Sequence, residues 1–532
     1  MRKILGFTFG ILGFCLPFIL NFDGLSFAGT LGLSIFLMAA MFWLFEPIPI
    51  HGTSLLIISL GILLLSNQSL IFKDAKLSTS DIKYVENNIY EVPLTALTKD
   101  NKVYIVDSKG ETVPVKVIII SRESDRITVQ SDELNSSSVL VTDSNHKLVG
   151  YKPINYTDYF YSLSNSIIML FLGGLLLADA AVKYNLDKNI TRTVLKPFGY
   201  KPTMITLGML SVTAMVSAFM SNTAATAMMM TVVLPIIAQL SPDDPFRKSI
   251  VLAIPFGANL GGIATPVGTP PNAVVLAALS KQGISIPFGT WVILALPYVI
   301  MMVLFAWWLL MKIYPAKSNR FELSMKSSFD KSKKAIRLYI IFALTILFWT
   351  TEAIHGVSAN IIAFFTVTAL VLTSVVDVKD IRRLPWEVLW LVAGGIALDI
   401  TMRATGLSTW LISQVAWSQL GGMAVLIGFA MAGVLLSTFI SNTVTATLLA
   451  PLVVGIASTI GGGFSIAIAA LVVGVATSCA MALPVSTPPN AIALSTGMVD
   501  SKGMAKIGAP IGIVGIILLL LFAKFYWPLI LN

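Results

Sequence analysis

The sequence predicts an all-α polytopic membrane protein, built from two inverted-topology repeats and interrupted by a small β insert. Three observations lead to this fold class: apolar runs recur along the chain, two polar motifs recur in register, and one charged segment breaks the pattern. Of the 532 residues, 56% are hydrophobic and only 12% are charged. Soluble domains carry about a quarter charged residues, so most of this chain cannot be solvated on all sides.

The apolar runs approach the length of transmembrane helices, which need about 20 residues to span a bilayer. They lie at Leu31–Phe45, Ser54–Leu65, Ser164–Ala181, Trp291–Leu310, Leu338–Trp349, Ile361–Val376 and Ile511–Phe522. With one re-entrant hairpin in each repeat, we expect about 11 spans, the first of them within residues 1–65.

The basic residues predict the orientation of the chain. Lys183–Lys201 contains five Lys and Arg residues and Lys312–Arg337 contains eight, whereas Asn21–Thr30 contains none. Because Lys and Arg are concentrated in cytoplasmic loops, the N-terminus and these basic segments are expected in the cytoplasm. The expected location is a bacterial-type inner membrane, with residues 66–158 extracytoplasmic.

Residues 66–158 have a different composition, with 24 charged residues (11 Lys and Arg, 13 Asp and Glu) and short segments in which polar and apolar residues alternate. The segments predicted as strands are Lys102–Asp107, Val113–Ile120, Arg126–Gln130 and Val139–Thr142. The run from Val92 to Leu97, together with Val103–Val106 and Asp125–Ile127, resembles the membrane-proximal β domain of periplasmic adaptor (membrane-fusion) proteins. A plain β insertion is the alternative, and no chemistry is assigned to this segment.

The transmembrane part repeats itself. Ser221-Asn222-Thr223 recurs 220 positions later as Ser441-Asn442-Thr443, and Pro266–Asn272 recurs as Pro484–Asn490 with six of seven residues identical. The predicted domains are the first helices (1–65), the insert (66–158), the rest of repeat 1 (159–312), a basic cytoplasmic linker (313–336) and repeat 2 (337–532). Counting spans places corresponding helices in opposite directions, as in many secondary transporters.

Both motifs interrupt apolar stretches with polar or proline residues. Backbone that leaves the helix inside a membrane must be buried in protein or line a cavity, so we expect a hairpin tip at each Ser-Asn-Thr and a helix break at each Thr-Pro-Pro-Asn. New helix N-termini bind anions, while exposed carbonyl and hydroxyl oxygens suit Na⁺. A single motif of this kind is more often a packing motif or a kink. Repetition in register favours a paired site for a two-ended anion.

The pairing of Ser-Asn-Thr with a downstream Thr-Pro-Pro-Asn, twice, resembles the divalent anion/sodium symporter family of dicarboxylate and sulfate carriers. The resemblance implies that Na⁺ is the coupling ion and that the protein forms homodimers. It implies substrate contacts from Asn222, Thr223, Thr269, Asn442, Thr443, Thr487 and Pro488. It implies a first sodium site at Ser217, Ser221, Asn222 and Gly268, and a second at Ser437, Ser441, Asn442 and Ser486.

Two opposite-charge pairs at i, i+4 also recur in register: Asp179 with Lys183, and Asp399 with Arg403. Such groups could relay protons. We favour a structural role, in which each pair fixes the position of its helix.

The resemblance and the repeats together predict sodium-coupled symport of C4-type dicarboxylates (succinate, malate, fumarate) by alternating access. Alternatives are a sulfate or other divalent-anion symporter, a sodium-independent dicarboxylate exchanger, and a transporter-like receptor or scaffold. An enzyme is not expected, because no nucleophile, base and acid meet at the apolar breaks. The expected partners are the small di-anion, sodium ions, the lipid bilayer and a second copy of the chain, with no nucleic acid.

Overall fold

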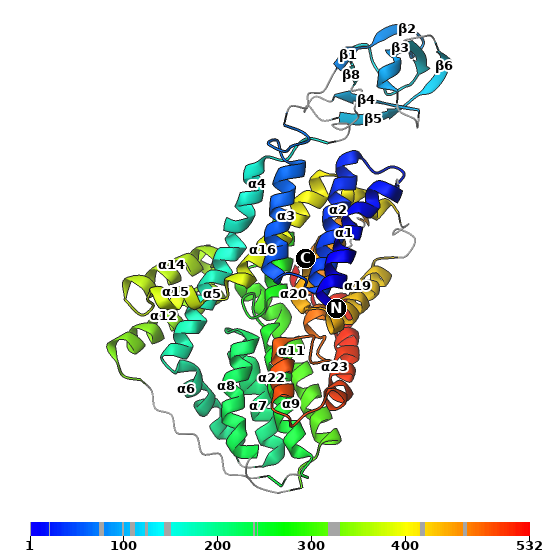
Figure 1. Cartoon of the computed structure of the whole chain (residues 1–532). Coiled ribbons are helices and arrows are strands. Elements are labelled where there is room, and N and C mark those ends of the chain that lie inside the picture. Colours follow the sequence, from blue (N-terminus) through cyan, green and yellow to red (C-terminus); the bar gives the residue numbers. More distant parts are fainter. Residues whose placement is uncertain are drawn as a thin grey trace. The chain divides into compact units, whose positions relative to one another are not determined.

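The computed structural model (Figure 1) describes most of the chain. The described residues are 2–20, 22–73, 79–97, 101–106, 112–122, 126–142, 151–199, 201–237, 240–241, 243–317, 330–414, 421–460 and 465–531. They divide into two compact units, one of residues 1–163 and 396–415, the other of residues 164–395 and 416–532. Residues 318–329 of the predicted basic linker lie outside the described residues.

The first unit combines apolar helices with the β insert. Its helices are α1 (Arg2–Leu20), α2 (Phe27–Phe45), α3 (Ile50–Leu65), α4 (Tyr156–Tyr161), the 3-10 turns Leu94–Ala96 and Ser162–Ser164, the end of α16 (Trp386–Ala404) and α17 (Leu407–Ser413). Helices α1 and α2 pack along each other. The Tyr159 hydroxyl lies 3.1 Å from Thr401 Oγ1, and Arg403 Nε lies 2.8 Å from Asp399 Oδ1. The predicted pair within α16 is therefore confirmed.

The β insert consists of two four-stranded antiparallel sheets with the strand orders β1-β8-β4-β5 and β2-β3-β7-β6. The strands are β1 (Thr79–Asp81), β2 (Lys83–Glu86), β3 (Ile89–Pro93), β4 (Lys102–Val106), β5 (Thr112–Lys116), β6 (Ile118–Arg122), β7 (Arg126–Gln130) and β8 (Val139–Val141). Buried Tyr90, Val92, Val103, Ile127 and Val129 belong to their common core.

The predicted strand Val113–Ile120 is wrong, because the structure divides it into β5 and β6, which belong to different sheets. Val117 forms the corner: its side chain is buried, and its N–H donates to the carbonyl of Asn101 instead of to a strand partner. Strands β1 to β3 were not expected, since charged residues interrupt their alternation. Asp107, at the end of another predicted strand, lies outside the described residues.

The second unit is helical. Its helices are α5 (Ser166–Lys183), α6 (Leu186–Leu195), the 3-10 turn Lys196–Phe198, α7 (Pro202–Ser217), α8 (Asn222–Ile237), α9 (Phe246–Gly262), α10 (Pro270–Ser280), α11 (Phe288–Ile313), α12 (Lys333–Thr350), α13 (Glu352–His355), α14 (Ala359–Leu372), α15 (Val378–Arg383), the start of α16, α19 (Gly422–Phe439), α20 (Asn442–Ile460), α21 (Ile466–Ser478), α22 (Pro488–Ser495), α23 (Ser501–Leu521), a π-helical turn (Phe522–Tyr526) and α24 (Pro528–Leu531). Helix α9 is buried along nearly its whole length, which places it in the core of this unit.

Within the described ranges, six helices are long and apolar enough to cross a membrane, or seven if the bent pair α16 and α17 counts as one span. Shorter apolar helices include α7, α10, α14 and α21. Short helices are expected where a span is broken into halves. The number of 11 spans and the opposite orientation of the two repeats stay predictions.

Candidate functional site

The two Ser-Asn-Thr motifs each lie between two helices that pack against each other. In the first repeat α7 ends at Ser217 and α8 begins at Asn222. In the second repeat α19 ends at Phe439 and α20 begins at Asn442. Contacts between α7 and α8, and between α19 and α20, make each pair a hairpin.

The serine of each motif caps the helix that follows. The carbonyl of Ser221 accepts from the N–H of Ala225 at 2.9 Å, and that of Ser441 accepts from Thr445 at 3.1 Å. Ser441 Oγ also accepts from the N–H of Val444 at 3.3 Å. The Ser441 side chain thereby satisfies an N–H group at the start of α20, as capping serines do.

The Thr-Pro-Pro-Asn motifs begin the second halves of two broken helices. After α9, the chain resumes as α10 at Pro270, with Thr269 in extended backbone conformation before it. After α21, it resumes as α22 at Pro488, with Thr487 as its cap. Proline is favoured at the first helical position, because its missing N–H would have no helical partner there. The proline pair therefore fixes where each half-helix starts.

Three oxygen atoms surround the terminal amide of Asn222 at the first break. Ser217 Oγ lies 2.6 Å from Asn222 Oδ1 and 2.9 Å from the carbonyl oxygen of Ala258. The same terminal amide atom of Asn222 lies 3.2 Å from the carbonyl oxygens of Ala258 and Gly268. Ser217 and Gly268 are buried. This group brings together three of the four residues predicted for the first sodium site and adds Ala258.

With the Asn222 oxygen facing this group, four oxygens share a single hydroxyl proton, that of Ser217. Rotating the Asn222 amide would instead point its nitrogen at the same place, where it would donate to Ala258, Gly268 and Ser217. The group is therefore satisfied in one of two ways, by amide protons or by a cation that accepts the Asn222 oxygen as a ligand. Clusters of carbonyl and hydroxyl oxygens at unwound helices are suited to Na⁺.

Two glycines let the backbone approach this group closely. A Cβ at Gly262 would lie 2.6 and 3.0 Å from the terminal amide atoms of Asn222 and 3.1 Å from Thr269 Cβ. A Cβ at Gly268 would lie 2.5 Å from the carbonyl oxygen of Gly262. Glycine is needed at both positions for steric reasons, since any side chain would displace Asn222 or the loop.

The corresponding positions of the second repeat include polar atoms without a partner. Ser437 Oγ and Asn442 Oδ1 are buried and have no hydrogen-bond partner in the part of the chain that the structure describes. Ser486 Oγ donates to the carbonyl of Leu483 at 2.6 Å and also accepts from Asn490 Nδ2 at 3.3 Å. Buried polar groups are normally satisfied, so these two oxygens are candidates for contact with a ligand.

The remaining predicted residues lie at the same junctions. Thr223 and Thr443 are half-buried in the first turns of α8 and α20, and the carbonyl of Thr443 accepts from Thr447 Oγ1 at 2.8 Å. Thr269 is buried, whereas Pro488 is exposed. Thr487 Oγ1 accepts from Asn259 Nδ2 at 3.2 Å.

The sequence-based prediction missed two residues of this region, Ala258 and Asn259. A backbone ligand such as the Ala258 carbonyl has no sequence signature. Asn259 did have one, because it is a polar side chain within the apolar segment that precedes the first Thr-Pro-Pro-Asn. Polar residues inside apolar spans are often functional.

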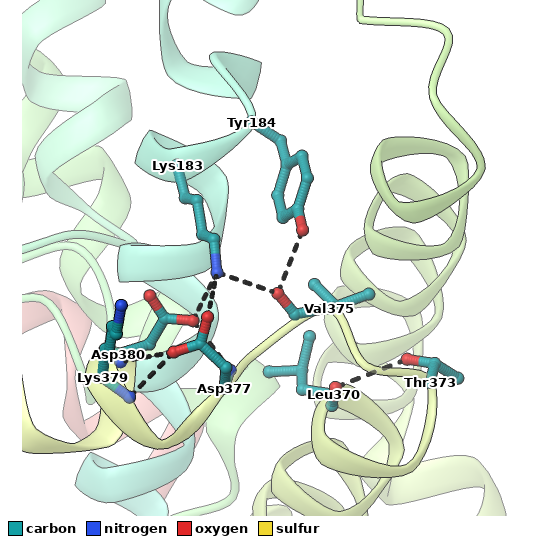
Figure 2. A network of polar contacts seen from close by, with 8 residues as sticks. All are labelled: Lys183, Tyr184, Leu370, Thr373, Val375, Asp377, Lys379 and Asp380. Atoms are coloured by element: carbon teal, nitrogen blue, oxygen red, sulfur yellow. Dashed lines mark hydrogen bonds and ion pairs between the residues drawn. The ribbon is translucent and has the colours of Figure 1, made fainter.

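Lys183, at the end of α5, lies against the carboxylates of Asp377, which caps α15, and of Asp380 within α15 (Figure 2). Its Nζ is 2.5 Å from Asp380 Oδ2 and 3.4 Å from Asp377 Oδ2. The predicted pair of Lys183 with Asp179 does not occur among the ion pairs of the described residues. Hydrogen bonds from the backbone N–H groups of Asp380 and Lys379 lower the pKa of Asp377 below its ordinary value, so this carboxylate is charged and available to Lys183.

Comparison with known proteins identifies relatives of most of the chain. The family model described as the sodium:sulfate symporter transmembrane region matches residues 148–532. The sodium-dependent dicarboxylate transporter SdcS of Staphylococcus aureus strain USA300 is 29% identical over 407 residues, which cover 69% of this chain and 78% of the relative. SdcS of strain NCTC 8325 gives the same values. Among solved structures, MtrF of Neisseria gonorrhoeae is similar in fold, with a TM-score of 0.50 at 12% identity, covering 77% of this chain and 90% of that chain.

Proposed function

Because the chain belongs to the sodium:sulfate symporter family, we propose that it is a secondary transporter that couples sodium entry to the uptake of C4-type dicarboxylates. The family resemblance inferred from the two repeated motifs is thereby confirmed. The members of this family are transporters, not enzymes. Sodium is in this view a co-transported substrate and not a resident cofactor. The dicarboxylate is proposed from the relative SdcS.

One observation supports the sodium part of the proposal: the oxygens of Ser217, Ala258 and Gly268 gather around the Asn222 amide in the first break. When sodium binds there, the Asn222 oxygen faces the ion, and its Nδ2 faces the opposite direction. That nitrogen then becomes a donor for a substrate carboxylate. Without sodium the rotated amide satisfies the two carbonyls itself, so its donors are engaged. A rotation of this kind would favour an order in which sodium binds before the anion.

Two helix N-termini support the proposal of a two-ended anion. Helices α8 and α20 begin at Asn222 and Asn442, and their first N–H groups add partial positive charge at the motif. A C4 dicarboxylate has two carboxylates, one for each Ser-Asn-Thr. The same residues are proposed to alternate in access to the two sides of the membrane through the inverted repeats. A homodimer, a cytoplasmic N-terminus and an outer position of residues 66–158 complete the proposal.

The experiment is uptake of labelled succinate into proteoliposomes that contain the full-length protein. We expect uptake that requires an inward sodium gradient and that excess unlabelled sulfate does not inhibit. Uptake that requires internal succinate, with no effect of sodium, would identify an exchanger instead. Inhibition by sulfate together with negligible succinate transport would identify a sulfate carrier.

A matched pair of variants tests the sodium site in the same assay. Ser217→Ala removes one of the four oxygens, so we expect a higher sodium concentration for half-maximal uptake. Ser458→Ala is the control, since this hydroxyl is exposed and donates to the carbonyl of Gly455 in its own helix. Equal sodium dependence of the two variants would remove Ser217 from the proposed site.

A further inference from the structure

Asn259 connects the first repeat to the second within the second unit. It lies in the last turns of α9, in the first repeat, and its side chain is 1% exposed. Its Nδ2 donates to Thr487 Oγ1 at 3.2 Å and to Asn490 Oδ1 at 3.1 Å. Both acceptors belong to the Thr-Pro-Pro-Asn motif of the second repeat. One buried side chain thus reaches from one repeat to the helix break of the other.

The contact with Asn490 determines how the second break is held. Asn490 Nδ2 donates to the carbonyls of Met481 and Leu483 at 3.0 and 3.1 Å, and to Ser486 Oγ at 3.3 Å. These bonds require that the nitrogen of Asn490 faces the loop, and this in turn requires that its oxygen faces away. Asn259 supplies the donor for that oxygen. It therefore fixes the amide that holds Ser486, a residue proposed for the second sodium site.

The residue before Asn259 belongs to the first proposed site. The carbonyl of Ala258 accepts from Ser217 Oγ at 2.9 Å and is 3.2 Å from the amide of Asn222. A cation that binds the Ala258 oxygen acts on the peptide unit that joins Ala258 to Asn259. Successive residues of a helix are only 1.5 Å apart along its axis. A change in that peptide therefore moves the side chain that holds the second break.

Among the described residues, the second repeat makes no equivalent contact with the helix break of the first. Thr477 occupies the position of the second repeat that corresponds to Asn259, at the 218-residue offset of the Thr-Pro-Pro-Asn motifs. Its Oγ1 donates to the carbonyl of Gly474 in its own helix at 2.9 Å. Asn272, the counterpart of Asn490, donates to Gly262 and Thr265, and its Oδ1 has no hydrogen-bond partner within the described ranges. Asn259 is thus a feature of the first repeat alone.

From this arrangement we propose that Asn259 is a positioning residue that couples the two sodium sites, so that sodium at the first site organises the second. The inference rests on the proposed function, because it requires both sites to bind sodium. It assigns to Asn259 no contact with substrate. Its effect passes through Asn490 and Thr487. The consequence is cooperative sodium dependence of transport, which is lost when the Nδ2 donor is removed.

The test is the sodium dependence of succinate uptake by the full-length protein in proteoliposomes. We expect a Hill coefficient well above 1 for the wild type and about 1 for Asn259→Leu, which keeps a similar volume but lacks the donor. The half-saturating sodium concentration should rise at least about fivefold, the lower end of typical coupling effects. The maximal rate at saturating sodium should be retained, whereas a merely structural role would lower that rate and leave the Hill coefficient unchanged.

Two further variants complete the design. Asn259→Thr copies the residue that the second repeat tolerates at the same helix position, so it serves if Asn259→Leu does not fold. Thr477→Val is the control, because it removes a hydroxyl at the equivalent position without touching the connection, and wild-type cooperativity is expected. A wild-type Hill coefficient preserved in both Asn259 variants would overturn the inference while sodium-coupled transport stands. Sodium-independent uptake by the wild type would refute the proposed function itself.

Discussion

Gly262 offers the sharpest steric test of the first site. An alanine Cβ there would lie 2.6 and 3.0 Å from the two terminal atoms of the Asn222 amide and 3.1 Å from Thr269 Cβ. Ordinary carbon contacts are about 3.5–4.0 Å, so the amide must move by several tenths of an ångström to about 1 Å. The change pushes on the side chain that we propose to hold both sodium and substrate.

The magnitude follows from the cost of overpacking a well-packed interior, which is about 1–3 kcal/mol. If that strain falls on the ion-bound geometry of Asn222, it raises the sodium concentration for half-maximal uptake by roughly 5- to 150-fold, since 1.4 kcal/mol is a factor of ten. The assay is sodium-dependent succinate uptake, normalised to the amount of folded protein in the proteoliposomes.

Gly428→Ala provides the matched control. Gly428 lies on α19, and a Cβ there would meet no atom of the described residues within 4 Å beyond the backbone of its own helix. This variant should be as active as the wild type and slightly more stable, because alanine favours the helix over glycine. If Gly262→Ala gave the sodium dependence of Gly428→Ala, the Asn222 amide would not be part of the ion site.

Two further predictions concern charges outside the sodium sites. Lys183→Met removes the ionic partner of buried Asp380, so it should lower the free energy of unfolding by about 1 kcal/mol after allowance for the partial exposure of Lys183. The measurement is thermal unfolding in detergent. The control Lys379→Met, whose exposed side chain lies on α15 beside Asp380, should show no such loss. The buried carboxyl of Asp187 has a pKa raised by burial, so its protonated form stabilises the fold below about pH 4, and that stability is lost as the pH rises through the raised pKa. The melting temperature of the wild type should therefore fall with rising pH relative to Asp187→Asn, and parallel curves would show that Asp187 does not titrate in this way.

The helix breaks could be predicted because their signals are local. Proline cannot continue a helix from the preceding residues, and Thr487 before Pro488 accepts a hydrogen bond at the new N-terminus, whereas the Thr269 side chain makes no such bond. These rules act within four residues, and the structure starts α10 at Pro270 and α22 at Pro488. Repetition in register then marked these breaks, and not the incidental kinks, as candidates for a site.

The partners of these breaks could not be predicted, because they depend on tertiary packing. The carbonyl of Ala258 looks like any other in the sequence, and only the close approach of α7 to α9 makes it a possible ligand. The partner of Lys183 is Asp380, 197 residues away, although Asp179 lies at helical spacing. Asp380 prevails because its capping box already fixes a charged oxygen at the place where α5 ends.

The two repeats use the same motif residues in different surroundings, and this difference argues against two equivalent half-sites. In the first, Gly262 and Gly268 bring backbone carbonyls against Asn222. In the second, the corresponding positions are Ala480 and Ser486, so a methyl group and a hydroxyl occupy that space. Oxygen ligands from the backbone are fixed by the helix ends, whereas a serine hydroxyl depends on its rotamer and on the amide that holds it. A second half-site of this kind needs an external constraint to be organised. The donor from Asn259, reaching across from α9, is the constraint that the structure provides.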